Sequence, residues 1–267
     1  MRKDFTVKEH YNIDDLLHIM YILRGQDGCP WDREQTHESI RKNMIEETYE
    51  VVEAIDRKTP DMLCEELGDI LLQVVFHTQM EAEQNVFDFD DVCDGICQKL
   101  ILRHPHIFAD VVADTSEQVL KNWDEIKKKE KGQKTASDTL RSVPAVLPAL
   151  MRAEKVQHRA AKTGFDYANA DEAMVDLKKE VVELEEAMAE DKAEHTQEEL
   201  GDVLFSAVNV ARLLHIDPEE MLTRSTEKFM GRFEKVERIA VQRGIDISTS
   251  SMDKLNALWA EAKESTN

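Results

Sequence analysis

Residues 61–84 read DMLCEELGDILLQVVFHTQMEAEQ, a pattern typical of one long helix. Apolar side chains from Leu67 to Phe76 surround that helix almost completely, which predicts that the segment is buried. Four polar residues interrupt the apolar surface at i, i+3, i+7 and i+11, namely Glu66, Asp69, Gln73 and His77. This spacing places them in one stripe along the helix.

A second helix is predicted over residues 39–57, and the two are joined at Lys58-Thr59-Pro60, with Asp61 as the expected N-cap of the later helix. Glu47 and Glu50 lie at i and i+3 on the earlier helix, flanked by apolar residues on the same side. Two antiparallel helices would therefore direct four carboxylates towards one another beside an apolar core.

The second half of the chain repeats these features in the same order. Glu180-x-x-Glu183 is followed by Glu199-Leu200-Gly201-Asp202, and Glu180 and Glu199 are 19 positions apart, as Glu47 and Glu66 are. The stripe continues through Ser206 and Asn209. Further matches pair Lys99 and Arg103 with Lys228 and Arg232, and Trp123 with Trp259. The chain therefore reads as two copies of one helical unit.

A charged segment without apolar periodicity, KKKEKGQK at 127–134, separates the copies and is followed by Pro144 and Pro148. We accordingly predict an N-terminal unit at 1–130, a linker at 131–148 and a C-terminal unit at 149–267.

Composition favours helices and excludes two classes of partner. The 267 residues include only 9 Gly and 6 Pro, and 55 Asp and Glu oppose 34 Lys and Arg, for a net charge of −21. Such a charge disfavours binding to nucleic acid and to anionic membranes. No apolar signal segment, membrane-length run or C-x-x-C pair is evident, so we expect reduced thiols and a cytoplasmic location.

Four carboxylates that converge beside a core need protonation, nearby cations or a metal ion, because burial and like charges destabilise the ionised forms. Hard oxygen ligands suit Mg²⁺, or alternatively Mn²⁺, and such ions bridge carboxylates to polyphosphates. The alternative is that these are ordinary solvated glutamate faces. Equal spacing in two copies favours the metal interpretation.

The repeated basic and aromatic residues have two interpretations each. Lys228 and Arg232, like Lys99 and Arg103, could hold phosphate oxygens or could be a basic surface pair. Trp259 and Trp123 could stack on a base or belong to the core. We interpret the histidines, including His37, His77, His104 and His106, as structural residues or as outer partners of the acids, not as metal ligands. The sequence contains no Walker A loop, Rossmann fingerprint or H-E-x-x-H motif.

Several motifs together resemble the two-domain MazG nucleoside triphosphate pyrophosphohydrolases, over about residues 13–264. They are GCPWDREQTH at 28–37, EETYE at 46–50, ELGD at 66–69, RHPHIF at 103–108 and the segment from Pro144 to Lys155. The resemblance implies an all-α fold of tandem MazG-like helical units, each of which forms a helix bundle on homodimerisation. It also implies Mg²⁺-dependent hydrolysis of normal and aberrant NTPs and dNTPs to nucleoside monophosphate and pyrophosphate.

Carried over by position, the resemblance implies a set of metal ligands in each unit: Glu180, Glu183, Glu199 and Asp202 in the second, and Glu47, Glu50, Glu66 and Asp69 in the first. It further implies that Lys228 and Arg232 bind phosphates and that Trp259 binds the nucleoside. Glu183 and Glu198 are our candidates for the general base that activates the attacking water. The phosphorus that is attacked stays open.

The second unit departs from the family pattern at four positions. Lys179 stands where a leading Glu is expected, Thr226 replaces an Asn, Tyr167 replaces a Trp, and His195 replaces a basic residue. The first unit keeps every acid, so either unit could be active, and we favour the second.

Two other functions stay open on the residues alone. One is a non-catalytic acidic helical protein that binds a nucleotide or a protein partner. The other keeps the chemistry but acts on dUTP or phosphoribosyl-ATP, against which the double copy and the Cys-Pro-Trp-Asp segment argue.

Overall fold

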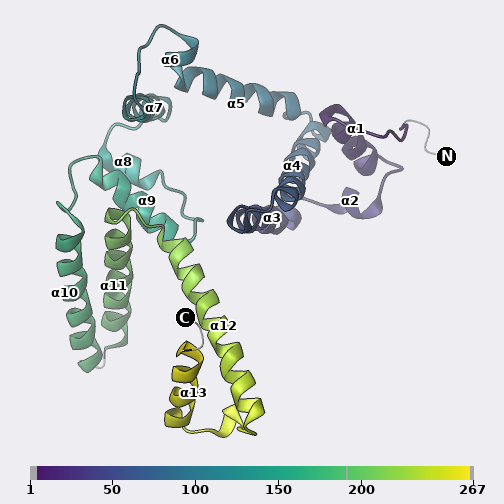
Figure 1. Cartoon of the computed structure of the whole chain (residues 1–267). Coiled ribbons are helices and arrows are strands. Elements are labelled where there is room, and N and C mark those ends of the chain that lie inside the picture. The colour runs from purple at the N-terminus through teal and green to yellow at the C-terminus, as the bar shows by residue number, and fades with distance from the viewer. Residues whose placement is uncertain (1–4, 191, 265–267) are drawn as a thin grey trace. The chain divides into compact units, whose positions relative to one another are not determined.

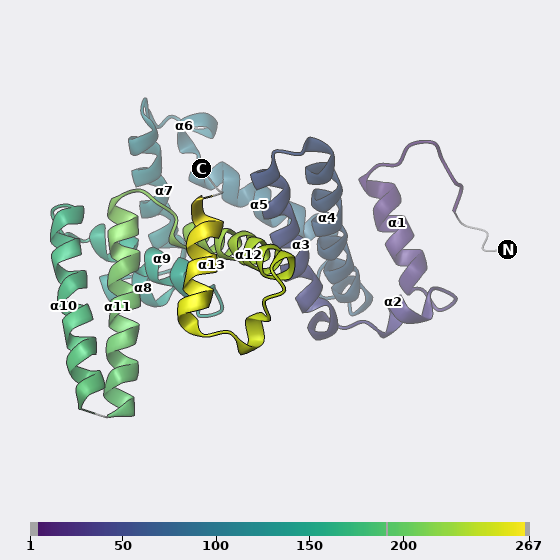
Figure 2. The same ribbon diagram turned by 60° about the horizontal axis from the view of Figure 1, so that its bottom comes forward.

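The computed structural model describes residues 5–190 and 192–264, and within these the regular structure is entirely helical. The chain divides into two compact units, with the first ending at Lys127 and the second beginning at Lys128. The all-α class and the tandem organisation are therefore confirmed. Figures 1 and 2 label the helices, and each unit is described by itself below.

The first unit is built around one helical hairpin, α3 with α4. Its helices are α1 (Ile13–Arg24), α2 (Pro30–Glu34), α3 (His37–Arg57), α4 (Pro60–Glu83), α5 (Phe89–Arg103), α6 (Pro105–Phe108) and α7 (Ser116–Glu130), which extends past the division. α1 packs against α4, and α5 follows from the end of α4.

Capping residues explain the ends of the α3–α4 hairpin. Thr36 and Ser39 form a capping box at the start of α3, and Lys58 ends that helix in the left-handed region with φ 55°. The predicted N-cap at Asp61 is wrong, because α4 begins at Pro60 with Thr59 before it. Proline suits the first helical position since its missing N–H has no partner there. Asp61 instead places a negative charge in the first turn of α4.

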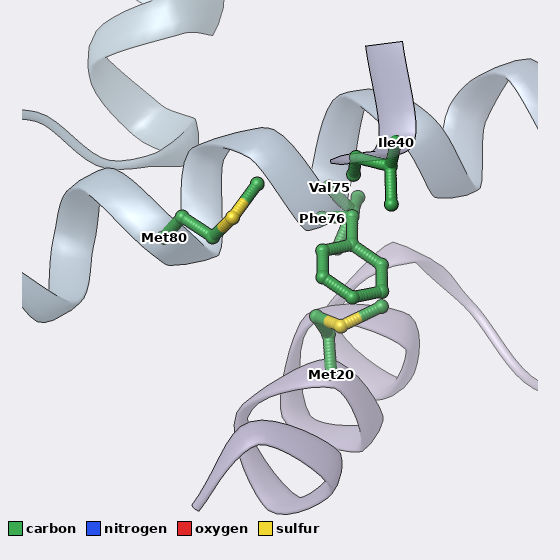
Figure 3. Packing of buried hydrophobic residues seen from close by; sticks show 5 residues of the cluster. All are labelled: Met20, Ile40, Val75, Phe76 and Met80. Atoms are coloured by element: carbon green, nitrogen blue, oxygen red, sulfur yellow. The ribbon is translucent and has the colours of Figure 1, made fainter. Parts of the chain in front are cut away.

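A single apolar cluster holds α1, α3 and α4 together (Figure 3). It consists of Met20, Ile40, Val75, Phe76 and Met80. The prediction that α4 is buried along its length is wrong for its first half, where Leu67 is 50% exposed and Leu71 38%. The reason is that the buried cluster contains α4 residues only from Val75 onwards.

The second unit contains two helical hairpins joined through α9 (Figure 1). Its helices are α8 (Ala136–Arg141), α9 (Ala149–Ala161), α10 (Ala170–Ala189), α11 (Ala193–Leu213), α12 (Pro218–Gln242), the short 3₁₀ helix η1 (Ile247–Thr249) and α13 (Met252–Glu264). α10 and α11 lie side by side in both views, and α9 contacts α11 and α12.

Buried contacts attach α9 to α11 and hold α12 against α13. Gln157 on α9 is 6% exposed, and its Nε2 donates to the Phe205 carbonyl on α11 at 2.8 Å. Between α12 and α13, the core is formed by Val236, Ala240, Leu258 and Ala262. None of the described helices is long and apolar enough to span a membrane.

Candidate metal centre

The α3–α4 hairpin brings three carboxylates of the first unit together. Glu47 from α3 and Glu66 and Asp69 from α4 each place an oxygen within 4.8 Å of the other two. All three side chains are only partly exposed. Two long helices joined by a tight connection therefore suffice to position this cluster, as the spacing predicted.

The pKa values of two members of this cluster are raised. For Glu47 the largest cause is burial, followed by the negative charge of Asp69 and then of Glu50. Burial is also the first cause for Glu66, followed by Glu50 and Glu65. Glu50 lies outside the set of three, yet its carboxylate is close enough to affect both glutamates.

The α10–α11 hairpin repeats the arrangement in the second unit. Glu180 from α10 and Glu199 and Asp202 from α11 place oxygens within 4.8 Å of one another. The pKa of Glu180 is raised, first by burial, then by Glu183 and Asp176. Glu183 thus stands beside this cluster as Glu50 stands beside the first.

These clusters have the chemistry of a site for a hard divalent cation. Carboxylate oxygens are the preferred ligands of Mg²⁺ and Mn²⁺, and acids from two opposed helices leave coordination positions for water and phosphate. Burial first, and then the charge of neighbouring carboxylates, raises the pKa values of Glu47 and Glu180. A bound cation would remove the repulsion between these carboxylates.

Two residues that depart from the family pattern lie directly beside the second cluster. His195 contacts Glu199, with Nε2 and Oε1 3.2 Å apart, and its Nδ1 lies 3.4 Å from Glu190. Lys179 pairs with Asp176, with Nζ and Oδ1 3.5 Å apart. Glu183 and Glu198, the candidate bases, both have exposed side chains on these helices.

The expected substrate-binding residues lie on the other hairpin of the second unit. Lys228 is exposed on α12, while the Nε of Arg232, one turn further on, is buried without a hydrogen-bond partner. Trp259 on α13 packs against Phe229, with ring centroids 5.1 Å apart. Within this chain, Lys228, Arg232 and Trp259 are thus brought to one hairpin and the acids to the other.

In the first unit, the basic residues instead surround the tryptophan. The Arg103 guanidinium lies 5.8 Å and the Lys127 ammonium 5.4 Å from the centroid of the Trp123 ring. These cation–π contacts occupy the ring, so Trp123 is less available for stacking on a base than the sequence alone suggested.

Two polar networks near the hairpins have no counterpart among the predicted site residues. The hydroxyl of Tyr167 donates to Asp176, and Arg212 of α11 binds both Asp166 and Asn209. The proximity of Asp176 to Glu180 can be read from their i,i+4 spacing. No local pattern relates Asp166 to Arg212, which are 46 positions apart.

Comparisons with known proteins match both hairpins to one family. The profile of the MazG nucleotide pyrophosphohydrolase domain matches residues 35–108 and again 169–237. The nucleoside triphosphate pyrophosphohydrolase of Escherichia coli K12 is 44% identical over 263 residues, covering 94% of this chain and 97% of that protein.

Two further relatives span most of the chain. The nucleoside triphosphate pyrophosphohydrolase/pyrophosphatase MazG of Thermotoga maritima is 42% identical over 250 residues, covering 94% of this chain and 95% of the relative. The uncharacterized protein YabN of Bacillus subtilis is 45% identical over 247 residues, which are 92% of this chain and 50% of that protein.

Proposed function

The chain belongs to the MazG nucleotide pyrophosphohydrolase family, and we propose that its second acidic cluster hydrolyses NTPs and dNTPs, normal or aberrant, in a Mg²⁺-dependent reaction. The enzyme class follows from the family: a nucleoside triphosphate pyrophosphohydrolase acts on a phosphoric anhydride and yields a nucleoside monophosphate and pyrophosphate. The observation that carries the site assignment is the convergence of Glu180, Glu199 and Asp202 within 4.8 Å.

In this proposal, Glu180, Glu183, Glu199 and Asp202 hold the cation, with Glu47, Glu50, Glu66 and Asp69 as the equivalent set in the first unit. When bound, Mg²⁺, or Mn²⁺ in its place, would supply neutralisation of triphosphate charge and a water of lowered pKa. The acids fit such an ion because they are hard oxygen donors, and Glu180, Glu199 and Asp202 converge where α10 and α11 meet.

The remaining steps fall to side chains of this protein. Glu183 or Glu198 accepts the proton of the attacking water as its oxygen bonds to phosphorus. The anhydride bond between the α- and β-phosphates then breaks, and the electron pair leaves on the departing phosphate oxygen. Lys228 and Arg232 bind phosphate oxygens, and Trp259 contacts the nucleoside.

We further propose a homodimer in the cytoplasm, with no nucleic-acid or membrane partner. The exposed apolar residues of the acid-bearing α11 support the dimer: Leu200 is 49% exposed, Leu204 53% and Phe205 45%. A second copy that covers this face could complete a helix bundle. The same copy could also bring the Lys228 hairpin of one chain towards the acids of the other.

Pyrophosphate release from a panel of NTPs and dNTPs, with Mg²⁺ or with EDTA, tests the proposal. We expect Glu199→Gln and Asp202→Asn each to lower kcat by at least about 100-fold, because each removes a charged ligand at the reacting phosphates. Far-UV circular dichroism should stay unchanged.

The equivalent first-unit variants, Glu66→Gln and Asp69→Asn, are the matched controls and should retain activity. Full activity in the second-unit variants with loss in the first would move the site to the first unit. The absence of metal-dependent turnover by the wild type on every nucleotide would overturn the catalytic proposal.

A further inference from the structure

The second cluster has an additional carboxylate beside it, held in place by a tyrosine. Asp176 lies on α10 one turn before Glu180, so both side chains occupy the same face of that helix. The hydroxyl of Tyr167 donates a hydrogen bond to Oδ2 of Asp176, and this contact raises the pKa of Tyr167 to about 12. The bond therefore fixes the orientation of the Asp176 carboxylate next to a proposed ligand.

The loop that bears Tyr167 is anchored independently of that bond. Gly164 adopts φ 90°, a conformation that side chains disfavour, and allows the chain to turn before α10. Asp166 pairs with Arg212 of α11, and the Arg212 Nε also donates to Asn209 at 2.9 Å. The loop therefore has an anchor on α11 that is separate from the bond between Tyr167 and Asp176 of α10.

The Lys179 ammonium pairs with the other carboxylate oxygen of Asp176. The Nζ–Oδ1 distance is 3.5 Å, and 66% of the Lys179 side chain is exposed. An exposed pair of this kind contributes little, so the carboxylate keeps most of its capacity to accept another hydrogen bond.

The first unit lacks this carboxylate. The residue four positions before Glu47 is Asn43, whereas the residue four positions before Glu180 is Asp176. The two clusters therefore share their converging acids but differ in the charge one turn away on the same helix.

We propose that Asp176 is a positioning residue that accepts a hydrogen bond from water in the shell of the cation, with Tyr167 fixing its orientation. This inference rests on the proposed function of the second cluster. Mg²⁺ keeps several of its waters when carboxylates bind it, so a carboxylate just outside the ligands has a donor to meet.

Binding of Mn²⁺, measured by electron paramagnetic resonance, tests the inference without reference to turnover. The measurements use the full chain with Glu66→Gln and Asp69→Asn in the first unit, so that the second cluster is observed alone. In this background, we expect Asp176→Asn to raise the Kd for Mn²⁺ about 10-fold or more, as loss of an outer partner does at other metal sites. Tyr167→Phe should raise it in the same direction by a smaller factor.

The double variant should bind Mn²⁺ no more weakly than Asp176→Asn alone, because the tyrosine acts through the aspartate. Asp166→Asn is the matched control: it breaks the other anchor of the same loop and should leave the Kd within about 2-fold, because it keeps the Tyr167–Asp176 bond. In the wild-type chain, Tyr167→Phe should also raise the Mg²⁺ concentration that gives half-maximal pyrophosphate release.

Failure of the inference and failure of the proposed function give different results. If the background protein binds Mn²⁺ and Asp176→Asn binds it equally well, Asp176 has no positioning role. The same conclusion follows if Asp166→Asn weakens binding as much as Tyr167→Phe does, since loop anchoring would then explain both. If neither the background nor the wild-type protein binds Mn²⁺, the proposed metal site itself is wrong.

Discussion

At the scale of single residues, the acids have opposite effects on stability and on cation binding. Glu47, Glu66 and Glu180 have raised pKa values because burial and neighbouring carboxylates disfavour the ionised form. Between the ordinary carboxyl pKa of 4.5 and the raised pKa of the folded state, the folded protein binds more protons than the unfolded protein. Metal-free stability is therefore lost as pH rises through that range.

Replacing Glu180 with Gln removes one repelling charge from the second cluster. In EDTA at neutral pH, we expect the variant to unfold at a Tm about 1–2 °C above that of the wild type. Excess Mg²⁺ should raise the Tm of the wild type more than that of the variant, since only folded protein with intact ligands binds the ion well. Differential scanning calorimetry measures both.

Glu186→Gln, an exposed change on the same helix outside the three converging acids, is the control for Glu180→Gln and should leave both Tm values near the wild type. A Tm for Glu180→Gln below that of the wild type in EDTA would contradict the interpretation that the acids repel one another.

A histidine pair in the first unit makes a second residue-scale contribution. The Nδ1 atoms of His37 and His77 lie 2.7 Å apart, and the His37 Nε2 lies 2.7 Å from Oε1 of Glu81. The rings are nearly parallel, with an interplanar angle of 4°. Burial first, and then the charge of His37, lowers the pKa of His77. This pair stabilises the contact of α3 with α4 when His77 is neutral.

Stability should therefore fall as the protein is acidified. Because His77 has a lower pKa folded than unfolded, the unfolded chain binds more protons below about pH 6.5, and the loss is complete below the folded pKa. Between about pH 7.5 and 5.5, the wild type should lose about 1–3 °C more in Tm than His77→Gln does.

The exposed His10 provides the control for this pH dependence, since His10→Gln should follow the wild type through the same range. A pH profile of Tm that is identical for the wild type and His77→Gln would show that His77 does not contribute.

Individual residues also show how far the site could be predicted. The interval of 19 positions predicts that Glu47 meets Glu66 and that Glu180 meets Glu199, because a helical hairpin converts spacing into contact. The Asp166–Arg212 pair could not be predicted in this way, since it depends on where the loop before α10 meets the end of α11. No local pattern relates His37 to His77 either, because they lie on different helices 40 positions apart.

At the scale of helices, local patterns predict the elements well and their environment less well. The helix expected over 39–57 is α3 (His37–Arg57), and the one expected over 61–84 is α4 (Pro60–Glu83). The small shifts arise from the capping box at Thr36 and from Pro60. Burial of Leu67 and Leu71 was predicted wrongly because periodicity describes the surface of a helix but not the partners available to cover it.

The apolar cluster of the first unit predicts which substitutions in α1 destabilise that unit. Met20 is 1% exposed within the cluster formed with α3 and α4, so Met20→Ala should destabilise the first unit by about 2–5 kcal/mol. Its neighbour Tyr21 is 66% exposed, and Tyr21→Ala should change stability by less than about 0.5 kcal/mol.

Hydrogen exchange followed by mass spectrometry distinguishes the effect of Met20→Ala by unit. Peptides from α1 and α4 should exchange faster in Met20→Ala, while peptides from α12 and α13 should keep their wild-type rates. Equal acceleration in both units would contradict the division of the chain into separately packed units.

At the scale of the whole molecule, each unit leaves an apolar surface of its acid-bearing hairpin uncovered. On α3, Tyr49 is 53% and Ile55 54% exposed, and on α11 the exposed fractions of Leu200 and Leu204 are 49% and 53%. Large apolar surfaces of this kind mark protein–protein contacts more often than free solvent-facing helices. The two-copy organisation could be predicted from internal repetition, whereas the exposure of these apolar residues within one chain could not, because periodicity does not tell which surfaces the same chain covers.

The proposed homodimer accordingly predicts that a charge on this face separates the copies. Leu204→Asp would place a carboxylate in an apolar contact, and a symmetric interface would contain the change twice. Since burial of one leucine is worth about 1.5–3 kcal/mol, the dimer Kd should rise by at least about 100-fold. Sedimentation equilibrium should show a two-chain mass for the wild type and weaker association for the variant, in which only the face of the first unit is unchanged. Val146→Asp, at a loop residue that is 91% exposed, should remain dimeric because it adds the same charge away from the hairpin. If the wild type sediments as a single chain at micromolar concentration, the exposed face of α11 has another partner, and the bundle proposed for each unit is wrong.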